Sequence, residues 1–92
     1  MTTLKEVIVR KPSQQEIKTA SKWPIWTCKP STFEWEYTQT ETCLILEGSV
    51  KITSPDSKDV VTFGPGDWVV FPEGLKCVWN VEKAVKKHYN FD

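Results

Sequence analysis

The sequence lacks an excess of charge, a long apolar run and a secretory start, and each absence excludes a class of protein. Twelve lysine and arginine residues balance twelve aspartate and glutamate residues, so no basic field exists to attract nucleic acid or acidic lipid headgroups. No apolar run approaches the roughly 20 residues that cross a bilayer. The first six residues also lack the charged-then-apolar order of a secretory signal. We therefore expect a cytoplasmic protein, with an organelle still open, that binds neither nucleic acid nor membranes.

Cysteine and histidine are scarce, which limits the redox and metal chemistry available. The three cysteines, Cys28, Cys43 and Cys77, are an odd number and lie far apart. That spacing forms neither a paired disulfide framework nor a CxxC zinc or redox motif, so a reducing compartment fits best. Each cysteine alone would pack as a small hydrophobe. The single histidine, His88, is by itself expected to be structural.

Most of the 92 residues have the pattern of short β-strands, rich in aromatic side chains. One helix is predicted, Gln14–Thr19, because Ser13 and Glu16 have the spacing of a capping box. A strand over residues 5–10 precedes it, and strands are predicted over residues 33–37, 41–46, 49–53, 60–63, 68–71, 75–81 and 84–91. With the aromatic and β-branched residues from Trp23 onward also taken as strand, about nine strands are expected in all. Strands at this spacing, with Gly and Pro turns between them, indicate an antiparallel sandwich or barrel.

Two stretches carry paired motifs with fixed spacing. Glu41, six residues and Gly48 form an E-x6-G motif that ends a strand, and Gly66, five residues, Pro72, one residue and Gly74 form a G-x5-P-x-G motif. The pair resembles the motifs of the cupin superfamily. The resemblance implies an all-β double-stranded β-helix, or jelly roll, as one domain over residues 1–92 with a core barrel over about residues 23–92 and one short N-terminal helix.

A narrower resemblance covers nearly the whole chain. The segments WPIW (23–26), ETC (41–43), LEG (46–48) and KHY (87–89) are similar to small single-domain cupins grouped with (S)-ureidoglycine aminohydrolase. The family's characterised aminohydrolase works through a bound metal. The resemblance therefore implies a small-molecule or enzymatic site in the barrel interior.

The metal-ligand positions of a cupin are altered in this chain. A metal-binding cupin has histidines four and six residues before the motif glutamate, and a third two residues after the second motif. These positions hold Tyr37, Trp35 and Cys77, so only Glu41 keeps its ligand identity. Indole has no lone pair to donate to a metal, and phenol is a poor partner for Zn, Mn or Ni. We therefore expect no classical cupin metal and no hydrolysis of ureidoglycine.

The same positions suggest a metal-free aromatic pocket. By the period-2 rule, inward-facing side chains would gather from several strands. The candidate ligand-binding residues are Trp35, Tyr37, Glu41, Cys43, Cys77, Trp79 and His88. Planar or cationic ligands would suit such a pocket. The competing interpretation is that the aromatics simply fill a small barrel, leaving a structural or oligomeric protein.

Two enzymatic alternatives use the same residues. Glu41, Cys77 and His88 could hold Zn or Fe as a rebuilt metal site. Alternatively, Cys77, His88 and Glu41 could act as nucleophile, base and orienting group of a thiol hydrolase. Burial of Glu41 without a charged partner would favour its protonated form and make it a general acid or base.

The remaining charged and apolar residues give two further expectations. Lysines such as Lys86 and Lys87 are expected to be solvated edge and loop residues. The apolar strand residues Leu44 and Leu46 would gain from burial between two copies, which suggests a homodimer.

Overall fold

A computed structural model describes residues 2–91, so the two end residues of the predicted domain lie outside the description. The elements are η1 (Leu4–Glu6, a 3-10 turn), β1 (Ile8–Arg10), α1 (Gln14–Ala20), β2 (Ile25–Cys28), β3 (Ser31–Glu36), β4 (Glu41–Thr53), β5 (Val60–Phe63), β6 (Trp68–Phe71) and β7 (Lys76–Phe91). Every strand pairing is antiparallel. The predicted all-β jelly roll with one short N-terminal helix is confirmed.

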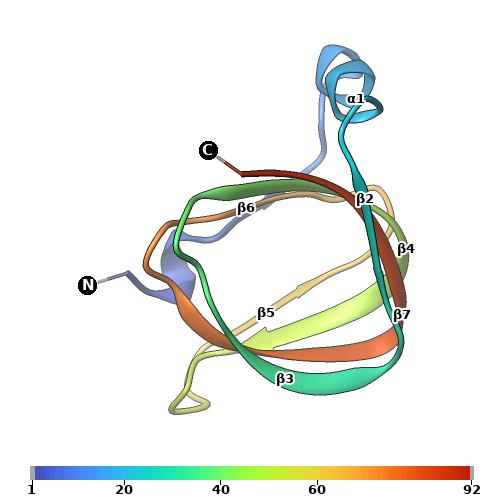
Figure 1. Cartoon of the computed structure of the whole chain (residues 1–92). Helices are drawn as coiled ribbons and strands as arrows, with labels where there is room; N and C mark the ends of the chain where they lie inside the picture. The colour runs from blue at the N-terminus through green and yellow to red at the C-terminus, as the bar shows by residue number, and fades with distance from the viewer. Residues whose placement is uncertain (1, 92) are drawn as a thin grey trace.

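The two longest strands form the middle of the sheet. The path runs β1-β6-β4-β7-β2, with β3 paired to β7 and β5 paired to β4. Both long strands change partners along their length: β4 pairs first with β6 and then with β5, and β7 pairs first with β3 and then with β2. Figure 1 looks into the resulting barrel, with α1 outside it beside β2.

The prediction of about nine short strands is wrong, since residues 2–91 contain seven. Residues 41–46 and 49–53 belong to one strand, β4, and residues 75–81 and 84–91 fall almost wholly in one strand, β7. Gly48, which was expected to end a strand, instead lies at a bulge inside β4, where the register with β7 shifts. Gly48 has φ +100°, and a Cβ there would lie 2.4 Å from the carbonyl oxygen of Ala84. Only glycine suits that close approach of two backbones.

The N-terminal segment is partly as expected. The predicted strand over residues 5–10 is shorter, because Leu4–Glu6 forms a 3-10 turn before β1. The helix extends one residue beyond the prediction, to Ala20, and its capping box is present: the Glu16 amide donates to Ser13 Oγ (3.1 Å) and the Ser13 amide to Glu16 Oε1 (2.8 Å).

Two packed clusters lie on opposite sides of the sheet. The larger cluster fills much of the barrel and includes Ile45, Val69 and Val85. The smaller cluster joins Ala20 of α1 to Leu44 and Trp68 on the outer side. The face of Leu44 that was expected to pair between copies is therefore covered within the chain. Within residues 2–91, no helix is long and apolar enough to cross a membrane.

Candidate functional site: an aromatic pocket around a buried ion pair

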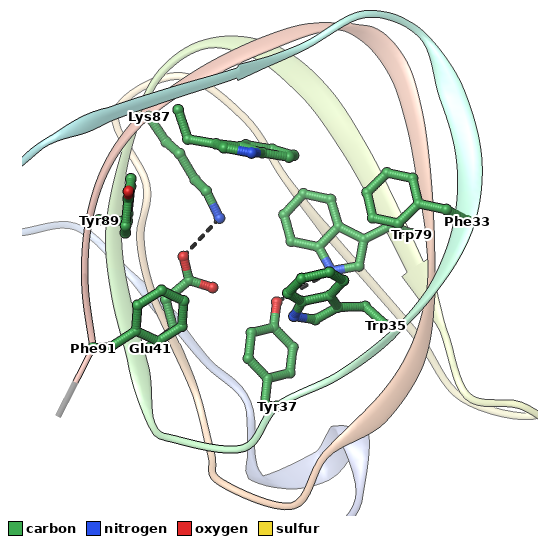
Figure 2. Close-up of a pocket in the computed structure, with 9 residues that line it drawn as sticks. Phe33, Trp35, Tyr37, Glu41, Trp79, Lys87, Tyr89 and Phe91 are labelled. Atoms are coloured by element: carbon green, nitrogen blue, oxygen red, sulfur yellow. Dashed lines mark hydrogen bonds and ion pairs between the residues drawn. The ribbon is translucent and has the colours of Figure 1, made fainter.

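A cavity of about 260 Å³ lies inside the barrel. Its walls come from β2, β3, β4 and β7, and from the link between β3 and β4; the lining residues are Trp26, Phe33, Trp35, Tyr37, Glu41, Trp79, Lys87, Tyr89 and Phe91. Trp35 and Phe91 are 48% and 43% exposed, so the pocket reaches solvent beside them. Seven of these nine residues are aromatic, and Figure 2 shows their rings surrounding the two charged ones.

The polar centre of the pocket is an ion pair between Lys87 and Glu41. Lys87 Nζ donates to Glu41 Oε2 at 2.8 Å, and each side chain is only 5% exposed. Glu41 is the first residue of β4, whereas Lys87 lies in β7 opposite Ile45. The long lysine side chain therefore reaches along the barrel to the carboxylate (Figure 2). Removing two charges from water is costly, so this pair depends on its mutual hydrogen bond and on the surrounding rings.

Two indole rings flank the lysine ammonium. Nζ lies 4.8 Å from the ring centroid of Trp26 and 4.8 Å from that of Trp79, with Phe71 at 5.9 Å. These distances fall within the range of cation–π attraction, which is strongest for tryptophan and for a desolvated cation. Phe33 stacks on Trp79 with centroids 5.9 Å apart. The position between the two indole rings is therefore already occupied by the Lys87 ammonium.

Tyr37 contributes a neutral phenol to the pocket. Its hydroxyl accepts a hydrogen bond from Trp79 Nε1 at 3.1 Å, and its ring stacks on Phe71 with centroids 4.8 Å apart. Burial, reinforced by the negative charge of Glu41, raises the pKa of Tyr37 above its ordinary value. The phenol therefore stays protonated in this pocket.

The structure separates the sequence-predicted site residues into two groups. Trp35, Tyr37, Glu41 and Trp79 line the pocket. Cys43 and Cys77 do not line it and lie in the larger core cluster, 0% and 2% exposed. Burial raises the pKa of Cys43 to about 12 and that of Cys77 to about 11.

His88 lies apart from the pocket. Its Nδ1 is 2.9 Å from the carbonyl oxygen of Trp23, and the alternation of β7 places it on the opposite face from Lys87 and Tyr89. The structure therefore does not bring His88 together with Glu41 and Cys77, either as metal ligands or as a thiol hydrolase triad. Among residues 2–91, no group of three or more His, Cys, Asp or Glu side chains is placed to hold a metal ion.

Sequence reasoning missed the most informative residue of the site. Lys87 was expected to be solvated, which is wrong, since it is 4% exposed. Lys86, the other lysine named with it, is 43% exposed at its side chain and lies 3.8 Å from Glu47. The available signal was the alternation of Val85, Lys87, Tyr89 and Phe91 along one strand, which places the lysine on a largely apolar face. Trp26, Phe33, Tyr89 and Phe91 were also missed.

The jelly-roll barrel, with Glu41 and Gly48 in the first cupin-type motif and Gly66, Pro72 and Gly74 in the second, has the architecture of a cupin. Residues 16–89 match the family model of the EutQ-like cupin domain. The chain belongs to the EutQ-like cupin family. No curated protein matches it.

Solved structures agree with this assignment. A DUF861 family protein from Thermotoga maritima is 44% identical, with a TM-score of 0.88 over 95% of this chain and 100% of that one. The EutQ protein of Clostridium difficile is 19% identical, with a TM-score of 0.66 over 92% of this chain and 66% of that one. A putative ethanolamine utilization protein Q from Salmonella typhimurium is 15% identical, with a TM-score of 0.63 over 92% of this chain and 68% of that one. At those last two identities the likeness concerns the fold.

Proposed function

We propose that this protein binds a small planar molecule in the aromatic pocket, with Lys87 and Glu41 as its polar contacts. The observation that carries the proposal is a 260 Å³ cavity with seven aromatic walls and one buried ion pair. Ligand sites commonly combine apolar walls with a few placed polar groups. An entirely filled barrel would leave no such space.

The size and charge of the pocket define the ligand class. A cavity of about 150 Å³ holds benzene, so 260 Å³ suits a single ring with a short substituent. The flat walls favour stacking. A cationic ligand, which the sequence also suggested, fits less well, because the Lys87 ammonium already occupies the position between Trp26 and Trp79. A neutral ligand that accepts from Lys87 suits the site best.

A divalent metal does not fit these residues. Of the four cupin ligand positions, only Glu41 offers a charged oxygen, and it is already paired with an ammonium that would repel a metal ion. Trp35 has no donor lone pair, and Cys77 does not line the pocket beside Glu41. The proposed function therefore uses the lysine ammonium, and no metal, as the positive group of the site.

The test is ligand binding by the whole chain. We expect benzyl alcohol, benzamide and phenol to raise Tm and to change tryptophan fluorescence, because the pocket contains three of the five tryptophans. Lys87→Met should weaken binding of the hydrogen-bond acceptor benzamide by about 10-fold, equivalent to the ~1.5 kcal/mol of a hydrogen bond to a charged group.

Lys86→Met is the matched control, since Lys86 is the adjacent residue and lies outside the pocket. It should bind as the wild type does. Equal binding by both variants would place the ligand elsewhere, and no response to any of the three compounds at millimolar concentration would contradict the proposal.

A further inference from the structure

We propose that the amine of Lys87 condenses with small aromatic aldehydes that enter the pocket, forming an imine, with Glu41 transferring the protons. This inference rests on the proposed function, because the aldehyde must first occupy the pocket. It adds a covalent reaction that simple binding does not require. The juxtaposition that supports it is a buried primary amine, a carboxylate in hydrogen-bond contact and an apolar cavity of matching size.

Lys87 has the surroundings of a nucleophilic lysine. Its side chain is 5% exposed and its Nζ contacts the cavity together with Trp26 and Trp79. Figure 2 shows Nζ pointing into the middle of the pocket. A lysine desolvated in a hydrophobic pocket is one recognised way to obtain an amine that attacks carbonyl groups. Lysines on the outer surface, such as Lys86 beside Glu47, can also lie near a carboxylate, but they lack the desolvation and the adjoining cavity.

Glu41 supplies the route for the proton. In the empty pocket the pair is ionic, because the carboxylate and the two indole faces stabilise the ammonium. Before the amine can attack a carbonyl carbon, the ammonium must lose one proton, and the carboxylate in hydrogen-bond contact is placed to accept it. Transfer of one proton across the 2.8 Å hydrogen bond then gives a free amine and a protonated carboxyl.

The reaction balances without any further reagent. The Nζ lone pair forms a bond to the aldehyde carbon, the carbonyl π pair moves to oxygen, and one proton passes from nitrogen to that oxygen to give a carbinolamine. The Glu41 carboxyl then protonates the hydroxyl, which leaves as water as the nitrogen lone pair forms the C=N bond. The net change is aldehyde plus ammonium to iminium plus water.

The product keeps the electrostatics of the site. The iminium carries one positive charge at the place of the original ammonium, and Glu41 is again a carboxylate. The attraction to Trp26 and Trp79 therefore persists. The aromatic ring of the aldehyde can stack against the walls, which favours aromatic over short aliphatic aldehydes.

The experiment is reductive trapping. The full chain is incubated with benzaldehyde and sodium cyanoborohydride, and the products are measured by intact and peptide mass spectrometry. We expect one benzyl group, at Lys87, to appear at least about 10-fold faster than any label at Lys86. Glu41→Gln should slow labelling of Lys87 by about 100-fold, because it removes the proton-transferring group. Labelling at all lysines with equal rates would overturn the inference.

A second pair of measurements separates this inference from the proposed function. Benzyl alcohol has the same ring and no carbonyl, and Lys87→Arg keeps the positive charge beside Glu41 but lacks the primary amine. If benzyl alcohol binds and benzaldehyde is not trapped at Lys87, the inference fails while the proposed function stands. If neither compound binds, both fail. Binding of benzyl alcohol by Lys87→Arg without any trapping, beside trapping by the wild type, supports both.

Discussion

Lys87 Nζ lies 2.8 Å from Glu41 Oε2 in a pocket of aromatic side chains, with both side chains 5% exposed. Glu41 occupies the motif position that is a metal ligand in metal-binding cupins. In this chain its partner is a lysine ammonium on the neighbouring strand. The pocket therefore contains the Lys87 ammonium as its positive group, whereas the other three metal-ligand positions of a cupin hold Trp35, Tyr37 and Cys77.

Breaking this ion pair should destabilise the fold more than removing both charges. Lys87→Met leaves a buried carboxylate without its partner, and we expect the free energy of unfolding to fall by about 3–5 kcal/mol. The double variant Lys87→Met with Glu41→Gln should recover most of that loss. Urea unfolding measures both. Lys86→Met should change the free energy of unfolding by less than about 0.5 kcal/mol. A loss as large as that of Lys87→Met would contradict the conclusion that the buried ion pair causes the effect.

The buried cysteines should resist alkylation in the native state. The thiolate is the reactive form, and burial raises the pKa of Cys43 to about 12 and of Cys77 to about 11. At pH 8 we expect iodoacetamide to label Cys28, which is partly exposed, well before either of them. Peptide mass spectrometry over time measures the order, with the urea-unfolded chain as control. Rapid labelling of Cys77 would support the thiol hydrolase alternative.

Gly48→Ala should be strongly destabilising. The new Cβ would lie 2.4 Å from the Ala84 carbonyl oxygen, at a backbone φ of +100°. We expect a loss of at least about 2 kcal/mol in urea unfolding, from backbone strain and overlap together. Gly64→Ala is the control, because its Cβ would meet nothing closer than 3.5 Å and its φ is not in the left-handed region. Equal effects of the two changes would contradict the bulge geometry.

The stability that the Glu16 carboxylate gives to the cap of α1 should decrease at acidic pH. The pKa of Glu16 is lowered to about 2, mainly by the hydrogen bonds that Arg10 donates and to a smaller extent by the hydrogen bond from the Ser13 amide. The unfolded value is about 4.3. A lowered folded-state pKa gives stability that is present above the unfolded value and is lost as pH falls toward the folded one. The Tm difference between wild type and Glu16→Gln should therefore shrink between about pH 4 and pH 2. A constant difference would contradict the role of the carboxylate.

Ureidoglycine with added Mn²⁺ should not be hydrolysed. The three histidine positions of a metal-binding cupin hold Trp35, Tyr37 and Cys77, and the remaining carboxylate is paired with Lys87. We also expect no stoichiometric metal by mass spectrometry in protein purified without chelator. Turnover that is abolished by Glu41→Ala would contradict this prediction, and bound metal that is lost in Cys77→Ala would support the rebuilt metal site.

Much of the barrel was predictable because its signals are local. Period-2 alternation predicted that Trp35 and Tyr37 face inward, and both line the pocket. The spacing of Glu41 from Gly48 gave the cupin motif and directed attention to the pocket carboxylate. The continuity of β4 through Gly48 was not predictable in the same way, because a glycine inside a strand has the same local signal as a glycine in a turn. Only the pairing of β7 with β4 on both sides of Gly48 shows that the strand continues.

The partner of Glu41 lay beyond the reach of local patterns. Lys87 is 46 residues away in sequence, and a lysine among charged neighbours has the composition of a solvated edge. Alternation places Lys87 on an apolar face, but it does not predict which residue of another strand meets it. Thus local side-chain order determined the strand regions, the capped helix and three of the aromatic wall residues, Trp35, Tyr37 and Trp79. The closure of β4 against β7 decided that Lys87 faces inward and His88 outward, because only strand register sets which side chains meet across the barrel.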